Sequence, residues 1–296
     1  MRVIDSHVHL YPPEVNNDPL GWAVVHDEPQ WAGLCTRIRR NGSSVQAFPS
    51  IDQLLREMDR VGVERSVLLG WYWRHPKTCE RQNRFYAECI QAHPDRLSAF
   101  ATIQPQGGSD TTLEEIRRAH GAGLIGLGEL SPHSQGYGIG NQAFRSALLL
   151  AGELGWAVNV HVTDPNCRPY PGRVETPLED YIALAREFPA VNFILAHWGG
   201  LLALREGAVA TLSNVYYDTA ASPLMYDDTV WGRVLAKVPR ERVLFGSDFP
   251  LNLYPKLDAG PNMHRLIDEA KKAGCSSDVL RENAAFLLRL KVRGAA

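Results

Sequence analysis

Short apolar runs alternate with amphipathic stretches about eight times along the chain. Most of these runs are rich in Val, Ile, Leu and Phe and show no polar alternation, which is typical of strands covered on both faces. The pattern predicts strands at Val3–Val8, Ser66–Gly70, Leu97–Ile103, Leu124–Leu130, Ala157–His161, Asn192–Ala196, Val215–Asp218 and Val243–Phe245.

The segments between these strands have the apolar spacing of helices. Ile51–Val61 carries a single apolar stripe, with Ser50 and Gln53 at capping-box spacing before it and Gly62 as a stop signal after it. Further helices are predicted at Leu113–His120, Gln142–Leu154, Leu178–Phe188, Leu201–Thr211, Asp228–Val238, Met263–Ala273 and Asp278–Leu290. Repeated strand–helix units favour an α/β fold with a parallel sheet and right-handed crossovers, either closed as a barrel or left open.

One long connection interrupts this rhythm. About forty residues, Leu10–Pro49, separate the first strand from its helix, and a connection of that length is usually a lid or a binding loop. Trp22, Trp31 and several prolines predict that this flap is ordered. The sequence has no internal repeat, low-complexity tract or Gly/Ser linker, so we expect a single domain, residues 1–296, with the flap inserted at residues 10–49.

Composition and charge narrow the class of protein. The 296 residues are 45% hydrophobic and 22% charged, which is ordinary for a folded globular protein. The net charge is −2, and there is no Lys/Arg cluster, which argues against nucleic-acid and membrane partners. There is no membrane-length apolar run, we expect no signal peptide, and the five cysteines form no CxxC pair. We therefore expect a cytoplasmic protein with reduced thiols that acts on a small molecule. The oligomeric state is open at this point, and a homo-oligomer is one alternative.

Candidate chemistry begins on the first strand. Asp5, His7 and His9 alternate along it, so their side chains share one face. Two neighbouring imidazoles at a strand end suit a shared divalent cation, and Asp5 is placed to brace one of them. An HxH pair alone is equally compatible with two surface histidines near a turn.

Other polar residues stand at equivalent positions on later strands. His161 and His197 end the fifth and sixth predicted strands, Asp248 follows the eighth, and Glu129 lies at the end of the fourth. The carboxyl ends of barrel strands meet at one face, where such folds gather their catalytic groups. His, His, Asp and Glu at these ends, together with the HxH pair, form a metal-site pattern.

The order and spacing of these residues resemble the amidohydrolase superfamily. The resemblance rests on His7-Val8-His9, His161, Ala196-His197-Trp198-Gly199-Gly200 and Gly246-Ser247-Asp248-Phe249-Pro250, and it covers essentially the whole chain. It is closest to the branch of TIM-barrel metal-dependent hydrolases that includes aminocarboxymuconate-semialdehyde decarboxylase. The resemblance implies a distorted (β/α)8 barrel with one or two divalent metals at its C-terminal mouth.

Residue chemistry and the family pattern assign the same roles. His7, His9 and His161 would supply neutral nitrogen ligands to Zn²⁺, or alternatively Mn²⁺, and Asp248 a carboxylate ligand. The ion would lower the pKa of its water toward roughly 7. Asp248 would take the proton of that water, and His197 would polarise a carbonyl or orient the nucleophile.

Glu129 is where the sequence departs from the family. Many binuclear members carry a lysine modified by carbon dioxide on strand four, and the matching position here holds Glu129. A carboxylate there could bridge a second ion, bind a substrate hydroxyl, or only hydrogen-bond near His161. The number of metal ions, one or two, is therefore open at this point.

Two loops at the predicted mouth combine aromatic residues with an arginine. An arginine suits bidentate recognition of a carboxylate, and aromatic rings form a flat wall for a substrate. The alternative is that the aromatics seal the barrel top and the arginines face solvent. The substrate-binding candidates are Trp71, Trp73, Arg74, Arg168, Tyr170 and Trp198.

These residues support two enzyme functions. The first is a metal-dependent hydrolase that uses an activated water on a small, carboxylate-bearing amide, lactone or ester. The second is a lyase that uses the same site for non-oxidative decarboxylation or hydration. A binding protein that has lost turnover is disfavoured, because the set of histidines and Asp248 is intact. The sequence does not separate the first two functions.

Overall fold

The computed structural model describes residues 2–205, 207 and 212–291 and contains two parallel sheets. The first sheet has the order β1-β2-β3 and the second the order β4-β5-β6-β7-β8. The strands are β1 (Val3–Val8), β2 (Val63–Leu68), β3 (Leu97–Ala99), β4 (Gly126–Leu130), β5 (Ala157–Val160), β6 (Asn192–Leu195), β7 (Val215–Asp218) and β8 (Val243–Leu244).

Backbone hydrogen bonds join the two sheets at both seams. Between β3 and β4, Ala101 N donates to Gly126 O at 2.8 Å and Gly128 N donates to Ala101 O at 2.8 Å. Between β8 and β1, Ser6 N donates to Phe245 O at 2.9 Å. The eight parallel strands therefore close into a distorted (β/α)8 TIM barrel, which confirms the predicted fold class.

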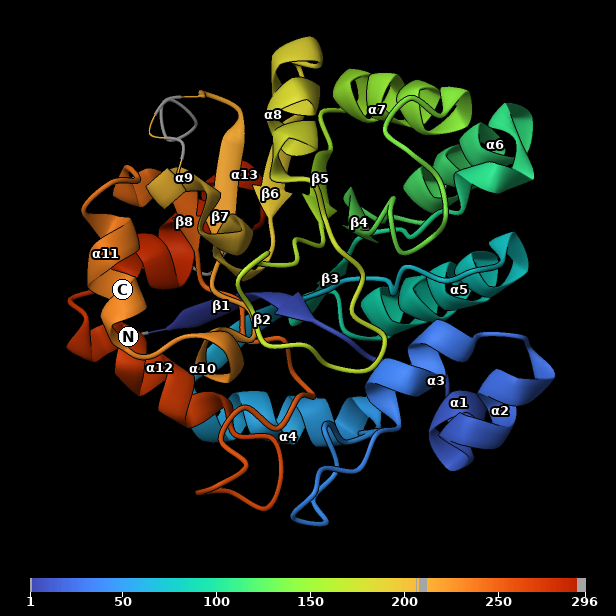
Figure 1. Cartoon of the computed structure of the whole chain (residues 1–296). Coiled ribbons are helices and arrows are strands. Elements are labelled where there is room, and N and C mark those ends of the chain that lie inside the picture. Colours follow the sequence, from blue (N-terminus) through green and yellow to red (C-terminus); the bar gives the residue numbers. More distant parts are fainter. Residues whose placement is uncertain (1, 206, 208–211, 292–296) are drawn as a thin grey trace.

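Helices surround the strands, as Figure 1 shows. One helix follows each strand, and short helices in the flap, directly after β7 and near the C-terminus add to this ring. The barrel helices are α4 (Ile51–Val61), α5 (Pro76–Ala92), α6 (Ser109–Gly121), α7 (Gln142–Leu154), α8 (Leu178–Glu187), α9 (Leu202–Arg205), α11 (Thr229–Leu235) and α12 (Met263–Lys272). The additional ones are α1 (Pro13–Asn17), α2 (Pro19–Val25), α3 (Pro29–Cys35), α10 (Ser222–Met225) and α13 (Asn283–Leu287).

Helix α5 is absent from the sequence prediction, because the face that it buries is largely polar. Its buried residues include Gln82 and Asn83, whose amides bond to strand-end backbone: Trp71 N donates to Gln82 Oε1 and Asn83 Nδ2 donates to Thr102 O. Polar residues on the inner face hide the helical period. The helix predicted at 201–211 is described only as α9, because residues 206 and 208–211 lie outside the described part of the chain.

Two layers of apolar side chains stabilise the barrel. The outer layer lies between strands and helices, while the inner layer fills the barrel with Ile4, Val67, Phe100 and Ile194. Helix α13 contributes Ala284 and Leu287 to the same inner layer. The two layers follow from the alternating directions of side chains along each strand.

The flap packs around its own aromatic cluster and covers one side of the barrel mouth. The ring of Trp31 lies 5.2 Å from that of Tyr11 and 5.5 Å from that of Trp73. The rest of the flap is joined to the chain after β8, where Asn252 N donates to Val45 O at 2.9 Å. The flap is therefore fixed at both ends. Among the described residues, no helix is long and apolar enough to cross a membrane.

Gly126 tests the packing of the inner layer. A Cβ atom at this position would lie 2.6 to 2.7 Å from carbons of the Phe100 ring. Gly126→Ala should therefore lower the free energy of unfolding by about 1–3 kcal/mol, measured by urea denaturation. Gly138→Ala is the matched control, because its Cβ meets nothing within 4 Å, and it should not destabilise. Equal stability of the two variants would contradict this account of the inner layer.

Candidate metal centre

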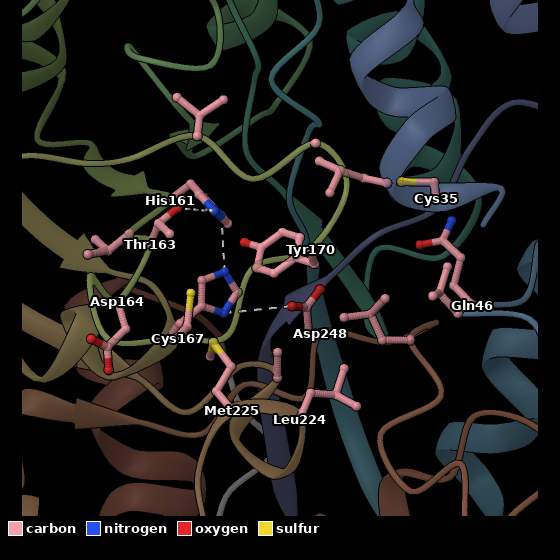
Figure 2. A pocket seen from close by; sticks show the side chains of 18 of the residues that line it. Cys35, Gln46, His161, Thr163, Asp164, Cys167, Tyr170, Leu224, Met225 and Asp248 are labelled. Carbon is pink, nitrogen blue, oxygen red and sulfur yellow. Dashed lines mark hydrogen bonds and ion pairs between the residues drawn. The ribbon is translucent and has the colours of Figure 1, made fainter. Parts of the chain in front are cut away.

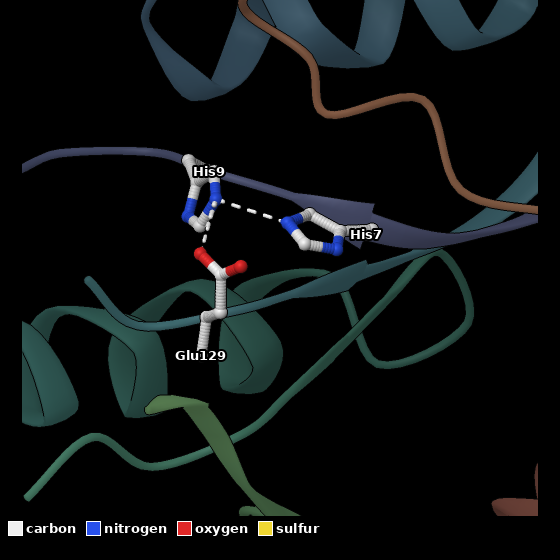
Figure 3. Close-up of side chains that lie close together, drawn as sticks. All are labelled: His7, His9 and Glu129. Carbon is white, nitrogen blue, oxygen red and sulfur yellow. Dashed lines mark hydrogen bonds and ion pairs between the residues drawn. The ribbon is translucent and has the colours of Figure 1, made fainter. Parts of the chain in front are cut away.

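Side chains from five strand ends converge at the C-terminal mouth of the barrel. Their ligand atoms form two overlapping groups, and within each group all atoms lie within 4.8 Å of one another. The first group is His7, His9 and Glu129, drawn in Figure 3, and the second is Glu129, His161 and His197. Four of the five predicted ligands therefore lie in these groups, with His161 in the group that contains His197 and Glu129 in both.

Asp248 completes the first group. His7 Nε2 and His9 Nε2 are 3.2 Å apart, and Glu129 Oε2 is 3.7 Å from His9 Nε2. Asp248 Oδ1 lies 3.8 Å from His7 Nε2 and 3.5 Å from His9 Nε2. Three strand ends, those of β1, β4 and β8, therefore present two nitrogens and two carboxylate oxygens to one small volume.

The ligand atoms of the second group lie equally close to one another. His161 Nδ1 lies 2.9 Å from Glu129 Oε1 and 3.1 Å from His197 Nε2. The same oxygen of Glu129 is 3.3 Å from His197 Nε2. The two oxygens of Glu129 thus face different groups of histidines, which is the arrangement that a bridging carboxylate needs.

Hydrogen bonds behind the imidazoles fix which nitrogen carries the proton. His9 Nδ1 lies 2.9 Å from Leu69 O and His197 Nδ1 lies 3.1 Å from Ala220 O. A carbonyl only accepts, so Nδ1 must donate, and in the neutral imidazole the Nε2 lone pair then faces the cluster. His7 Nδ1 is likewise held by Asp218 Oδ2 at 2.8 Å. His7 Nε2 and His9 Nε2 face each other at 3.2 Å, so a cation, either a proton or a metal ion, lies between them, and this pair of nitrogens fits a bound metal ion.

The buried negative charge of this cluster also indicates a bound cation. The carboxylates of Glu129, Asp218 and Asp248 are all buried. Burial alone would raise the pKa of Glu129, but the charge and hydrogen bond of His161 hold it well below its usual range. Burial likewise disfavours protonation of His7, yet Asp218 and Asp248 raise the pKa of that imidazole to about 10. A divalent cation would neutralise this excess of carboxylate charge.

Two of these residues have a strained backbone. His197 has φ of +59° and Asp248 has φ of +64°, in the left-handed region that side chains other than glycine rarely adopt. Such strain costs roughly 1–3 kcal/mol per residue and concentrates at functional sites. Hydrogen bonds hold both in place, since His197 N donates to Asp218 Oδ1 at 2.9 Å and Asp248 N donates to His7 O at 2.9 Å. Gly199 and Gly200 continue the left-handed turn after His197.

The cluster opens into a cavity of about 680 Å³, shown in Figure 2. Three predicted substrate-binding residues line it, namely Trp71, Arg168 and Tyr170. The Trp71 ring lies edge-on to His9 at 5.6 Å and stacks on Tyr72 at 4.2 Å. The flap forms the opposite wall with Leu34, Cys35, Arg37, Arg39, Val45 and Gln46.

The other three candidates do not line this cavity. Trp73 is buried in the flap cluster, where its Nε1 donates to Gln82 Oε1. The Arg74 side chain is 57% exposed and pairs with Asp27, with its Nη1 3.2 Å from Oδ1. Trp198 is fully buried, donating to Ser222 Oγ at 2.9 Å. Each of these side chains has a structural partner that turns it away from the cavity.

Sequence reasoning assigned the bracing role to the wrong carboxylate. Asp5 accepts hydrogen bonds from Ser247 Oγ and from Ser247 N at 2.9 Å and contacts no imidazole nitrogen. Asp218 instead holds the His7 ring. It is the last residue of a predicted strand, so the strand-end position that indicated His161 was a signal for Asp218 too. Tyr72, also in the cavity wall, had no such signal.

Asp218 gives a test of the metal site. Protein reloaded with zinc or manganese should hold at least one divalent ion per chain by elemental analysis. Asp218→Asn should weaken metal binding about 10- to 100-fold, because an amide holds the His7 tautomer less firmly. Asp180→Asn is the matched control, since Asp180 pairs with His133 at 2.9 Å outside the cluster. Folded protein that stays free of metal after reloading would refute the site.

Comparisons with known proteins agree with this geometry. The family model for amidohydrolases matches residues 4–290. No curated protein matches the sequence. Among solved structures, the 5-carboxyvanillate decarboxylase from Novosphingobium aromaticivorans, complexed with manganese and 4-hydroxy-3-methoxy-5-nitrobenzoic acid, has a TM-score of 0.71 at 14% identity. That alignment covers 98% of this chain and 96% of the other.

Two further structures have the same fold. The 2,6-dihydroxybenzoate decarboxylase from Rhizobium has a TM-score of 0.64 at 18% identity, covering 98% of this chain and 99% of the other. The probable 2-pyrone-4,6-dicarboxylic acid hydrolase from Acinetobacter baumannii, with citric acid bound, has a TM-score of 0.66 at 14% identity, covering 98% and 100%. At these identities the likeness shows the fold, while the family model covers nearly the whole chain. The chain therefore belongs to the amidohydrolase family.

Proposed function

We propose that this chain is a metal-dependent hydrolase acting on a small, carboxylate-bearing amide, lactone or ester. The observation that carries the proposal is the set of imidazole nitrogens and carboxylates that face one another where the barrel opens into the cavity. That donor set suits Zn²⁺ first and Mn²⁺ second. The manganese in the Novosphingobium decarboxylase supports a divalent ion in this fold.

We propose two ions that share Glu129. His7, His9 and Asp248 would hold the first with one oxygen of Glu129, and His161 and His197 would hold the second with the other. When bound, a divalent ion acts as a Lewis acid and lowers the pKa of a coordinated water.

The residues of the chain carry the proton transfers and the binding. Asp248 accepts the proton of the attacking water and delivers it to the leaving group. Its strained backbone, tied to His7 O, fixes the carboxylate at the cluster. His197 orients the reacting carbonyl, and its ring is itself fixed by Ala220 O. The flap wall limits the access of other water to the cavity.

Substrate binding falls to the walls of the cavity. Trp71 and Tyr170 present aromatic faces, and Arg168, on the loop after β5, supplies a guanidinium for a carboxylate. The cytoplasmic location expected from the sequence stays a prediction, and a homo-oligomer stays one alternative for the oligomeric state.

The alternative is a lyase that removes carbon dioxide or adds water with the same metal centre. Two of the three structures described above are decarboxylases, one of 2,6-dihydroxybenzoate and one of 5-carboxyvanillate, which favours keeping this alternative. The two functions separate in a screen of carboxylate-bearing amides, lactones, esters and aromatic acids with metal-loaded enzyme. Release of acid without carbon dioxide supports the hydrolase, and release of carbon dioxide supports the lyase.

Asp248→Asn should remove nearly all turnover while the protein stays folded. The amide cannot accept the proton that the attacking water must lose. His197→Asn should lower turnover and leave most of the metal in place, checked by elemental analysis of the same preparation. If Asp248→Asn retains the wild-type rate, the proton acceptor is another group, and Glu129 becomes the candidate.

Arg168→Ala should lower kcat/KM about 30- to 1000-fold, because losing a charged hydrogen bond to substrate costs on the order of 2–4 kcal/mol. Metal content and melting temperature should not change, since the Arg168 side chain is exposed at the mouth and supports neither the core nor the ion. Arg74→Ala is the matched control and should keep full activity. Equal turnover of a substrate and its neutral isostere would contradict the role of Arg168.

A further inference from the structure

The second half of the flap is a small hairpin that stands on the loop carrying Asp248. Its two arms are joined by the bridge between Ile38 and Ser44 and by Val45 N, which donates to Arg37 O at 3.0 Å. Asn252 N in turn donates to Val45 O at 2.9 Å. The hairpin therefore holds a fixed position beside the metal centre, only a few residues from a ligand.

Two arginines of this hairpin line the cavity, and they differ in what their guanidinium groups contact. Arg39 donates to Ser44 O at 2.6 Å, to Asn252 O at 3.0 Å and to Val45 O at 3.4 Å, so it joins the hairpin to the barrel. Arg37 is half-buried and lies with Cζ 5.9 Å from the centre of the Tyr170 ring. Within residues 2–205, 207 and 212–291, no acceptor or carboxylate is bonded to its guanidinium.

Other arginines around the mouth already have carboxylate partners. Arg74 pairs with Asp27 at 3.2 Å, and Arg205 pairs with Asp164 at 2.7 Å. Asp164 also accepts a hydrogen bond from Tyr226 at 3.0 Å, so this cavity carboxylate is fully occupied. The remaining cavity carboxylates, Glu129 and Asp248, belong to the metal cluster.

Arg37 is consequently a cation that lines the cavity and has no protein acceptor among the described residues. Arg168, two residues before Tyr170 on the loop after β5, also lines the cavity and lacks an acceptor in the same part of the chain. A guanidinium binds a carboxylate by two parallel hydrogen bonds. The contact with Tyr170 holds the Arg37 group in place, since a cation over an aromatic face is attracted to it.

We propose that Arg37 binds a second carboxylate of the substrate, so that the natural substrate is a dicarboxylate whose other carboxylate is held by Arg168. The proposal rests on the hydrolase function for the role of Arg168, but the role of Arg37 in binding is separable from turnover. Because the hairpin stands on the loop of Asp248, a carboxylate on Arg37 fixes the substrate relative to the proton acceptor. Arg37 is thus a specificity-determining residue supplied by the flap.

The test compares two probes of the same shape by titration calorimetry on the metal-loaded protein. Isophthalate carries two carboxylates, and 3-carbamoylbenzoate replaces one of them by a neutral amide. Wild-type protein should bind isophthalate at least tenfold more tightly. Arg37→Met should reduce that preference to less than threefold, and Arg37→Lys, which keeps the charge, should retain part of it. Arg74→Met, with its side chain outside the cavity, should match the wild type.

Two results would overturn the proposal. One is a wild-type protein that binds the two probes equally or binds neither. The other is an Arg37→Met variant that keeps the full preference with normal metal content and melting temperature. A calorimetric preference that depends on Arg37 supports the proposal even where no substrate is hydrolysed, so its failure and that of the hydrolase function are distinguishable.

Discussion

The convergence of imidazole nitrogens and buried carboxylates at the barrel mouth is the constraint on which the rest of the structure depends. Leu69 O and Ala220 O hold Nδ1 of His9 and His197, so that both rings turn Nε2 to the cluster, and Asp218 does the same for His7. Four imidazoles and several buried carboxylates in so small a volume are stable together when a cation joins them. The left-handed backbone at His197 and Asp248 is strained, and the packing of the cluster keeps both residues in that conformation.

The barrel and the flap have separate roles around that centre. Strand ends supply every candidate ligand, because the carboxyl ends of parallel strands meet at one face. The flap supplies no ligand in either group but builds one wall of the cavity and stands on the loop after Asp248. In the proposed function the barrel carries out the chemistry, and the flap selects the substrate. This division explains how one family carries out several reactions on one fold.

Much of this was predictable from sequence, for a physical reason. Strand-end positions identified His161, His197, Glu129 and Asp248, since the carboxyl ends of the strands of a parallel barrel all lie at the mouth. Helix α5 was missed because its buried face carries amides that satisfy strand-end backbone. Asp218 also stands at the end of a predicted strand, so the same criterion would have identified it.

Loop residues were harder to predict than strand ends. Trp71 and Arg74 stand in one loop, yet only Trp71 lines the cavity, because Asp27 in the flap pairs with Arg74. Arg37 gave no signal at all, since its position depends on how a hairpin packs against a segment some two hundred residues away. A side chain placed by such long-range packing leaves no periodic pattern in the sequence.

Anomalous scattering from crystals grown with manganese tests the central claim most directly. Data collected at the manganese absorption edge should show two peaks, one beside His7 and His9 and the other beside His161 and His197, with Glu129 between them. Well-ordered crystals without a peak at either group would contradict a metal centre. A single peak would contradict the sharing of Glu129 by two ions.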